Sequence, residues 1–128
     1  MILTLMIEPN KKPMRYYAKP TEDSLRRAVS IGYEDIHDIK IKHMEDDVYL
    51  VHASNISPLE HKANRRIAGE IISGTFLIVR INGSKHLVSL TEEDVDVYRE
   101  LFETPEVFSA EEAVTACVDQ ILAEIENP

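Results

Sequence analysis

Imidazole and thiol side chains, which often catalyse reactions or bind metals, are few in this 128-residue chain: five histidines and one cysteine, Cys117. Imidazole and thiolate groups bind zinc and related metals when three or four of them converge. His52 and His61 lie nine residues apart. His37 and His43 lie six apart on one expected strand, and the chain contains no His-x-x-x-His pair. The spacing therefore predicts no metal site.

Nucleophilic and phosphate-binding motifs are also missing from the sequence. Cys117 falls on the apolar stripe of the last expected helix, where burial raises the pKa of a thiol and makes it inert. No Gly-x-Ser-x-Gly, glycine-rich phosphate loop or Gly-x-Gly-x-x-Gly motif occurs. We therefore expect no catalytic residue and no bound cofactor, and an enzymatic activity is disfavoured.

A cationic cluster lies mid-chain, where four possible cations and the Asn64 amide fall within seven residues. Two exposed guanidiniums could grip a phosphate or carboxylate in a forked geometry. This interpretation predicts a binding patch made of Asn64, Arg65, Arg66, Gly74 and Thr75. In the alternative, the two arginines pair with acidic groups of the C-terminal helices, and Asn64 holds a loop through backbone hydrogen bonds. Both interpretations stay open at this point.

The chain is acidic, with 14 Lys and Arg against 23 Asp and Glu and a net charge of −9. Residues 1–70 hold 11 of each sign, whereas residues 71–128 hold 3 basic and 12 acidic side chains. A field of this sign repels phosphate backbones, so direct nucleic-acid binding is disfavoured. One cysteine excludes an internal disulfide, and no span is apolar enough for a membrane helix. We expect a cytoplasmic protein without membrane contact.

Alternation of apolar side chains predicts about six strands. Residues 2–7 are apolar on both faces, which is typical of a central strand. Ile39 and Ile41 alternate with charged neighbours, so we expect these isoleucines to be buried. Lys40 and Lys42 then face water. The expected strands are residues 2–7, 14–19, 36–43, 48–53, 74–81 and 85–90.

Two connections between these strands have distinct signals. Residues 54–70 show no sustained period of two and contain chain-breaking residues, so we expect a loop with one helical turn near 59–63. Asn82-Gly83 tolerates positive φ and predicts a type I′ hairpin turn.

Capping residues predict three helices. The first begins at Thr21, the second at Thr91 and the third at Ser109, which opens a helix over 109–126. We therefore expect an α+β fold: a mostly antiparallel sheet of about six strands, a short helix after the first hairpin, and two C-terminal helices covering one face. The third helix carries a wide apolar stripe of Val114, Cys117, Val118, Ile121, Leu122 and Ile125. This stripe either docks on its own sheet or pairs with a second chain, giving a monomer or a weak homodimer.

Several short motifs resemble one known family in order and spacing. They are Glu8-Pro9, Asn64-Arg65, the run 72–79 and the run 89–93, with Tyr98 and Phe102 downstream. The chain resembles a domain-of-unknown-function family of small proteins from phages, conjugative elements and bacteria, especially Firmicutes. We expect one domain over 1–128, with a family-like core over 1–105 and a C-terminal helical extension over 106–128. The family has no established activity, so the resemblance implies a mobile-element accessory protein and no catalytic residues.

Two functions follow from these patterns. The first is a non-catalytic interaction module, an acidic inhibitor of a nucleic-acid-processing or defence protein, with a host or element-encoded protein as partner. Its acidic helices would present carboxylates to a basic cleft, although an ordinary solvated face has the same composition. The second is a small-ligand or nucleotide-binding protein, with or without enzymatic activity, that uses Asn64-Arg65-Arg66.

Overall fold

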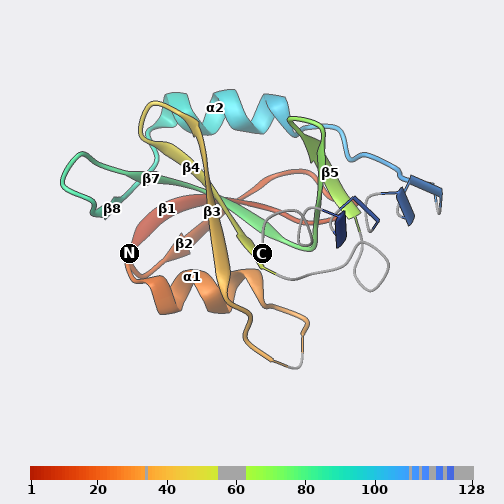
Figure 1. Cartoon of the computed structure of the whole chain (residues 1–128). Helices are drawn as coiled ribbons and strands as arrows, with labels where there is room; N and C mark the ends of the chain where they lie inside the picture. Colours follow the sequence, from red (N-terminus) through yellow and green to blue (C-terminus); the bar gives the residue numbers. More distant parts are fainter. Residues whose placement is uncertain are drawn as a thin grey trace.

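A six-stranded antiparallel sheet lies between two layers of other elements (Figure 1). Its strands are β1 (Ile2–Ile7), β2 (Met14–Ala18), β3 (Ile39–Glu45), β4 (Val48–Ala53), β7 (Phe76–Ile81) and β8 (Leu87–Val88). Their order is β2-β1-β7-β4-β3, and β8 pairs with β7. The computed structural model describes residues 1–33, 35–54, 63–109, 111–112, 114–115, 118–119 and 121–122. Within these residues the α+β class and the antiparallel sheet are confirmed.

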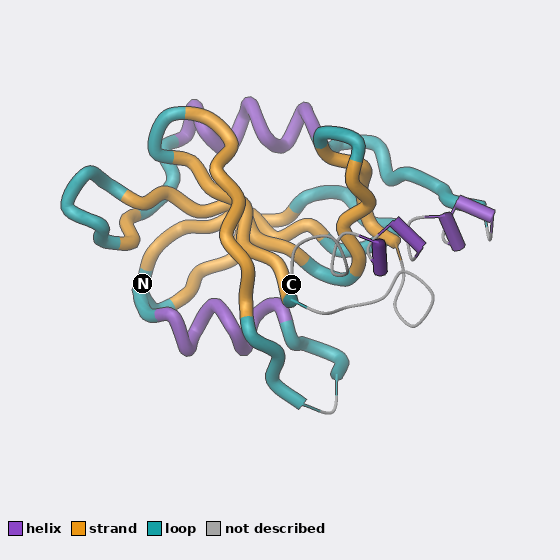
Figure 2. Tube along the Cα trace, viewed as in Figure 1, coloured by secondary structure: helices purple, strands orange, loops and turns teal. Residues whose placement is uncertain are grey.

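The sheet is covered on both faces, not on one as expected from the sequence. Helix α1 (Glu22–Val29) lies on one face and helix α2 (Glu92–Leu101) lies on the other (Figures 1 and 2). The described part of the chain contains these two helices with defined bounds, not the three expected. Of the third, expected over 109–126, the described residues from 111 onward are helical, Ser109 is not, and the others lie outside the described part. The α1 layer results from the apolar positions of this helix, Leu25, Ala28 and Val29, all of which are buried.

Strand β1 is buried along its whole length, which confirms its expected central place. Leu5 and Ile7 pack into the core on the α2 face. Met6 points to the opposite face and packs into the core under α1. A strand whose successive side chains enter two cores needs apolar residues at every position.

Strand β3 forms one edge of the sheet, and its burial differs from the expectation. Ile39 is half-buried, but Ile41 is 51% exposed. Lys40 is exposed, and Lys42 makes an ion pair of 3.5 Å with Glu70. The expected burial of Ile41 is wrong because the core under α1 centres on β1, β4 and β7 and only partly covers the outermost strand.

A second hairpin occupies residues 63–73, where the sequence suggested a loop. It consists of β5 (Ala63–Ile67) and β6 (Glu70–Ser73), and its residues Ile67 and Ile72 pack into the same core as α2. The turn residues Ala68 and Gly69 have φ of 50° and 84°. Positive φ at both positions is the geometry of a type I′ turn, which alanine rarely adopts. The expected loop is therefore wrong over 63–70, and the expected helical turn near 59–63 lies almost wholly outside the described residues.

The turn at Asn82-Gly83 is wider than expected. Neither residue has positive φ; the left-handed residue is Lys85, with φ of 62°. The Asn82 side-chain oxygen accepts hydrogen bonds from the backbone N–H groups of Ser84 and His86, each at 3.0 Å. The type I′ prediction is wrong here because Asn82 stabilises a longer loop with its side chain.

Helix α2 begins with a complete capping box. The Thr91 side chain accepts from Asp94 N at 3.0 Å, and Asp94 Oδ2 accepts from Thr91 N at 2.9 Å. The same carboxylate accepts from Arg80 of β7, at 2.8 Å from Nε and 3.0 Å from Nη2. These bonds hold the pKa of Asp94 below its usual value, with the Arg80 bond as the largest cause and the Thr91 bonds adding to it. The start of α2 is thereby attached to the sheet.

We expect Asp94→Asn to lower the free energy of unfolding by about 2 kcal/mol at neutral pH, since it loses the charge-assisted pair with Arg80 and weakens the cap. A carboxylate with a lowered native pKa stabilises the folded state above its unfolded pKa, near 3.9 for aspartate. The difference between wild type and variant should therefore shrink as the pH falls through that value. Urea unfolding at a series of pH values measures this difference.

The matched control is Asp23→Asn in the first turn of α1. Asp23 also pairs with an arginine, Arg27, but both side chains are mostly exposed. Asp23→Asn should lower the free energy of unfolding much less than Asp94→Asn does. An Asp94→Asn effect that is the same size in acid as at neutral pH would contradict the role given to this carboxylate.

Candidate functional site

The five residues predicted to form a binding patch begin with Asn64, which is fully buried in β5. The β5–β6 pairing shifts register between Ala63 and Arg65, so Asn64 lies in an irregularity that turns its side chain inward. Its Nδ2 donates to the backbone carbonyls of Ile7 at 2.8 Å and Gly74 at 2.7 Å. Gly74 has φ of 72°, a left-handed conformation that glycine adopts without strain. Asn64 thus joins the hairpin to the end of β1 and the start of β7.

Arg65 is also buried, with 2% of its surface exposed. Its Nη1 donates to the backbone oxygen of Asn64 at 3.2 Å and to the Asn64 Oδ1 at 2.8 Å. Its Nη2 donates to the carbonyls of Lys11 at 2.8 Å and Phe102 at 2.9 Å. Burial lowers the pKa of this guanidinium, and nearby Glu106 partly opposes that effect. The charge is held mainly by neutral carbonyl oxygens.

These contacts determine whether the predicted patch can bind an external anion. The structure brings Asn64 and Gly74 together, as expected, and leaves Thr75 half-buried beside them. The expected exposure of Arg65 is wrong, because its Nη groups are turned inward toward carbonyls of three chain segments. An external anion could reach Nη1 or Nη2 only by displacing these bonds. Asn64 and Arg65 therefore join elements of the fold.

Arg66 lies at the surface and contacts the C-terminal segment. Its Nη2 donates to Glu112 at 2.8 Å, and its backbone N–H donates to the Glu106 carboxylate. The guanidinium carbon lies 5.8 Å from the centre of the Phe108 ring. For Arg66, the alternative of pairing with a C-terminal acidic group is confirmed. For Asn64, the alternative of backbone hydrogen bonds is confirmed as well.

The histidines do not converge in the part of the chain that the structure describes. No group of three or more His, Cys, Asp and Glu side chains there is arranged to hold a metal. His52 bonds the Ala53 carbonyl through Nδ1 at 3.0 Å, and burial lowers its pKa. His43 bonds the Asp46 carbonyl through Nε2 at 2.7 Å. His61 and Cys117 lie outside the described residues.

The outward side of α2 carries a surface of which the sequence analysis indicated only the acidic character. We call it the α2 outer face and define it by Glu93, Asp96, Val97, Glu100 and Leu101, all of which are exposed. Val97 is 48% and Leu101 is 61% exposed. Among the described residues, no basic side chain lies within ion-pair distance of the three carboxylates. The i, i+3, i+4, i+7 and i+8 spacing of these five residues is the signal that could have revealed this face.

Helix α1 shows what an ordinary solvated acidic face looks like in the same protein. Its carboxylates pair with arginines one turn later: Glu22 with Arg26 at 2.9 Å and Asp23 with Arg27 at 2.8 Å. The α2 outer face lacks such partners among the described residues. Its charge is therefore available to another molecule.

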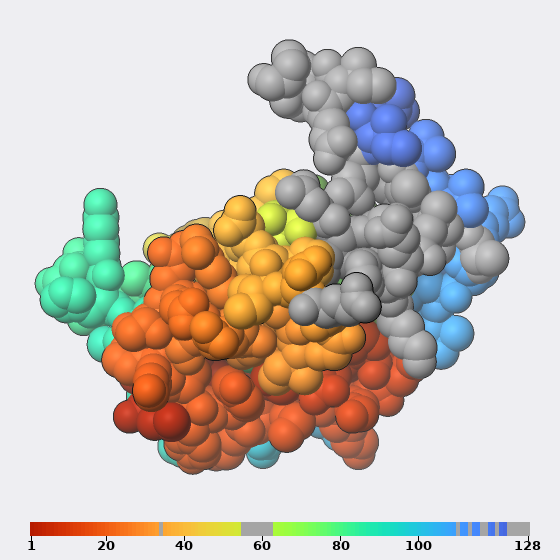
Figure 3. Space-filling model, turned by 90° about the horizontal axis from the view of Figure 1, so that it is seen from below, coloured from red at the N-terminus to blue at the C-terminus, as the bar shows by residue number. Residues whose placement is uncertain are grey.

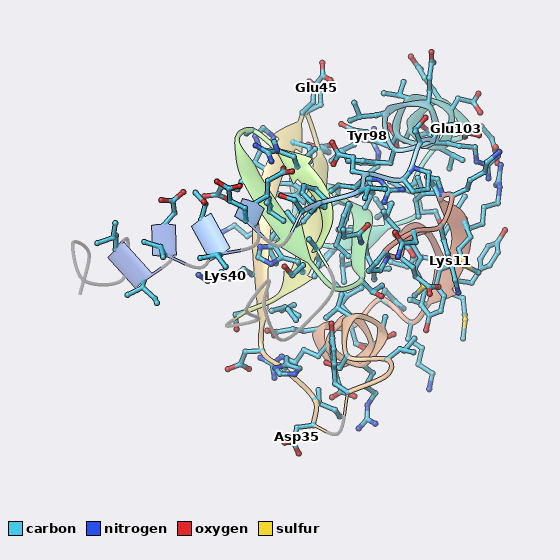
Figure 4. All side chains as sticks on the ribbon, turned by 90° about the vertical axis from the view of Figure 1, so that its right-hand side faces the viewer. Lys11, Asp35, Lys40, Glu45, Tyr98 and Glu103 are labelled. Carbon is cyan, nitrogen blue, oxygen red and sulfur yellow. The ribbon has the colours of Figure 1, made fainter. Side chains whose placement is uncertain are left out.

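The basic residues near α2 lie to one side of this face. Arg15 of β2 forms a forked pair with Glu92 at 3.0 and 2.5 Å, which lowers the pKa of Glu92 and raises that of Arg15. Lys12 pairs with Glu103 at 3.2 Å, just beyond the end of the helix. Figure 4 shows Glu103, Tyr98 and Glu45 at the α2 side of the molecule and Asp35 at the opposite side. Ion pairs therefore connect both ends of the helix to the rest of the chain, while its outer face stays exposed to solvent.

Comparison with known proteins returned no match: no protein-family model, curated protein or solved structure matches the chain. The resemblance to the phage and conjugative-element family stays a prediction. Among the described residues, no helix combines the length and apolar character that crossing a membrane requires.

We expect Arg65→Ala to lower the free energy of unfolding by about 3 kcal/mol, because buried carbonyl groups lose their donors and the segments they join come apart. Arg65→Lys should lower the free energy of unfolding nearly as much, since one ammonium group cannot replace the two Nη groups of the guanidinium. Arg66→Ala should cost under about 1 kcal/mol, as for other exposed pairs. Urea unfolding at neutral pH compares the three variants. Equal stability of Arg65→Ala and Arg66→Ala would contradict a structural role for Arg65.

Proposed function

We propose that this protein is a non-catalytic interaction module that binds a basic surface of a partner protein through the α2 outer face. The observation that carries this proposal is a row of three exposed carboxylates beside an exposed apolar pair on the same face of α2. The carboxylates have no ion-pair partner within the described chain, and the helix is anchored by its capping box and by Arg80. Such a face binds without a change of backbone conformation.

The two kinds of side chain on this face contribute in different ways. Val97 and Leu101 lie one turn apart and supply apolar area at the centre of a contact. Glu93, Asp96 and Glu100 lie along one side of this pair and attract a basic partner over a distance of about 10 Å at about 0.1 M salt. Partner affinity should therefore depend on the apolar pair, and the rate of association on the carboxylates.

A nucleic-acid-processing or defence protein of the host is the partner class that this charge pattern fits best. Clefts that bind DNA carry positive potential to match one phosphate per about 1.7 Å of duplex. The three carboxylates extend along about 10 Å of rigid helix and could occupy such a cleft in place of phosphates. This role is consistent with the mobile-element or phage-type accessory protein that the sequence resemblance implies, a protein that acts on a host or element-encoded partner inside the cytoplasm.

The alternative function, binding of a small ligand or nucleotide, has less support. It relies on Asn64, Arg65 and Arg66, of which the first two are buried and bonded within the chain. Of the five residues of the predicted patch, only Arg66 and Thr75 retain exposed surface. Native and denaturing mass spectra of the purified protein separate the two functions, since a mass difference equal to a small molecule would favour the alternative.

We expect Glu93→Lys combined with Glu100→Lys to reduce partner capture at least about tenfold, because like charges then meet across the contact. The measurement uses the tagged protein as bait in a bacterial lysate, followed by quantitative mass spectrometry of bound proteins. Capture by the wild type should fall with increasing salt, and duplex DNA should compete with it.

The matched control is Asp35→Lys combined with Asp38→Lys, which makes the same change of charge on the opposite side. Both residues are exposed and lie far from the α2 outer face (Figure 4 labels Asp35). This control should capture the same proteins as the wild type. If both double variants lose capture equally, overall charge is responsible and the α2 outer face is not a specific site.

A further inference from the structure

Strand β2 forms one edge of the six-stranded sheet, and β3 forms the other. In Figure 3, viewed from the α1 side, the β1–β2 hairpin (red to orange) lies along the border of the molecule opposite β3 (amber to yellow). Figure 4 shows Lys11, in the turn before β2, and Lys40 of β3 at opposite sides of the sheet. Two large side chains of β2 are exposed, Met14 at 47% and Tyr17 at 56%. Among the described residues, no strand pairs with the outer side of β2.

The hydrogen bonds of β1 show which backbone groups of β2 point outward. Leu3 N donates to Ser89 Oγ at 2.9 Å, and Leu3 O accepts from Leu90 N at 3.0 Å, so Leu3 is bonded on the side away from β2. Successive residues of a strand direct their backbone groups to opposite sides, so Thr4 bonds toward β2. Thr4 lies opposite Tyr16, and its Oγ1 also donates to Tyr16 O at 2.6 Å.

The outward groups of β2 therefore belong to Arg15 and Tyr17. Because Tyr16 bonds inward to β1, the residues on either side of it direct their N–H and C=O groups away from the sheet. Within the described chain, neither residue makes a backbone hydrogen bond outside the strand ladder. Unpaired groups of this kind are a template for a further strand.

The two edges of the sheet differ in how well they resist such pairing. Strand β3 contains Lys40 and Lys42, and its pairing with β4 shifts register near its end. Edge lysines and register irregularities hinder the addition of a strand. Strand β2 contains no lysine, and its register with β1 is unbroken. Its one cation, Arg15, is already paired with Glu92. The edge formed by β2 is therefore the one open to pairing.

The charges of β2 select one register for pairing with a second copy. If two β2 strands meet antiparallel about a two-fold axis at Tyr16, Arg15 of each copy lies opposite Tyr17 of the other. Each of these opposed pairs then exchanges both of its backbone hydrogen bonds. In the two neighbouring registers that use the same outward groups, Arg15 meets either Arg15 or Lys19 of the other copy, and like charges face each other.

We propose that β2 pairs with β2 of a second copy in the Tyr16-centred register and joins the two sheets into one. The pairing brings the Arg15 guanidinium to the Tyr17 ring of the other copy and places the exposed Met14 opposite Ala18. A charged segment of another protein would find no unpaired charge within β2, which is why a second copy fits this edge best. The pairing does not depend on the proposed function, because it uses a different surface.

Sedimentation equilibrium of the full chain, in reducing buffer with about 0.15 M NaCl, tests the proposal. We expect reversible dimerisation between about 10 µM and 500 µM protein, because a strand of 5 residues gives a small interface. A chain that stays monomeric up to about 500 µM overturns the proposal and leaves this edge to an extended segment of another protein.

Lysine substitutions locate the contact. Tyr17→Lys should weaken dimerisation at least about tenfold, because the new side chain faces Arg15 of the other copy. Ile41→Lys is the matched control, since Ile41 is 51% exposed and lies on the other edge strand. The control should dimerise at least as tightly as the wild type, because it reduces the net charge of −9. Retained dimerisation in Tyr17→Lys, or equal loss in both variants, overturns the assignment, and circular dichroism verifies that each variant is folded.

Cysteine substitutions test the register. In a chain that carries Cys117→Ser, Tyr16→Cys should form a disulfide-linked dimer on oxidation, because the two residues at the axis form a non-hydrogen-bonded pair with Cα atoms about 4.5 Å apart. Met14→Cys is the control on the same face of the strand. Its two copies would lie about 14 Å apart along the paired strands and should not crosslink. Equal crosslinking of the two variants would rule out the Tyr16-centred register.

Discussion

One buried guanidinium links the parts of this protein on the α2 side of the sheet. Arg65 bonds the turn after β1 through Lys11, the end of α2 through Phe102, and its own strand through Asn64. Hydrogen bonds to Nη1 and Nη2 stabilise this buried charge, whereas Nε is buried without a partner among the described residues. Because a buried charge that loses its acceptors is costly, these oxygens must stay in place together. The position of α2 over the sheet and the position of the β5–β6 hairpin are therefore coupled.

Because the buried residues Asn64 and Arg65 connect elements of the fold, a binding function must use side chains on the outer surface. Because Asn64 and Arg65 are used inside the fold, Arg66 is the only cation among the described residues of the cationic cluster that reaches the surface, and it pairs with Glu112. The acidic excess, by contrast, is distributed over the exterior of α2 and the segment beyond it. Helix α1 neutralises its own acids with arginines, whereas the described neighbours of the α2 outer face do not. An asymmetric surface of this kind is suited to recognition of a basic partner.

Local features of the fold could be predicted from the sequence. The helix starts at Thr21 and Thr91 were recognisable because a cap involves residues only three positions apart. The central place of β1 was recognisable from its unbroken apolar run. The β5–β6 hairpin was missed because Ala68 occupies a left-handed turn position where glycine or asparagine is the usual signal.

The sequence by itself determined most of the segments that form strands and helices, though not the β5–β6 hairpin, and it determined how unevenly the charge is distributed. Periodicity, capping and composition depend on neighbouring residues alone. Only the tertiary structure decided that Arg65 is buried while Leu101 and Ile41 are exposed. Burial depends on which distant segment covers a side chain, and Arg65 is bonded to a segment 54 residues away along the chain. For the same reason, Asn64 and Arg65 of the predicted cationic patch connect elements inside the fold, and the exposed face of α2 is the candidate site.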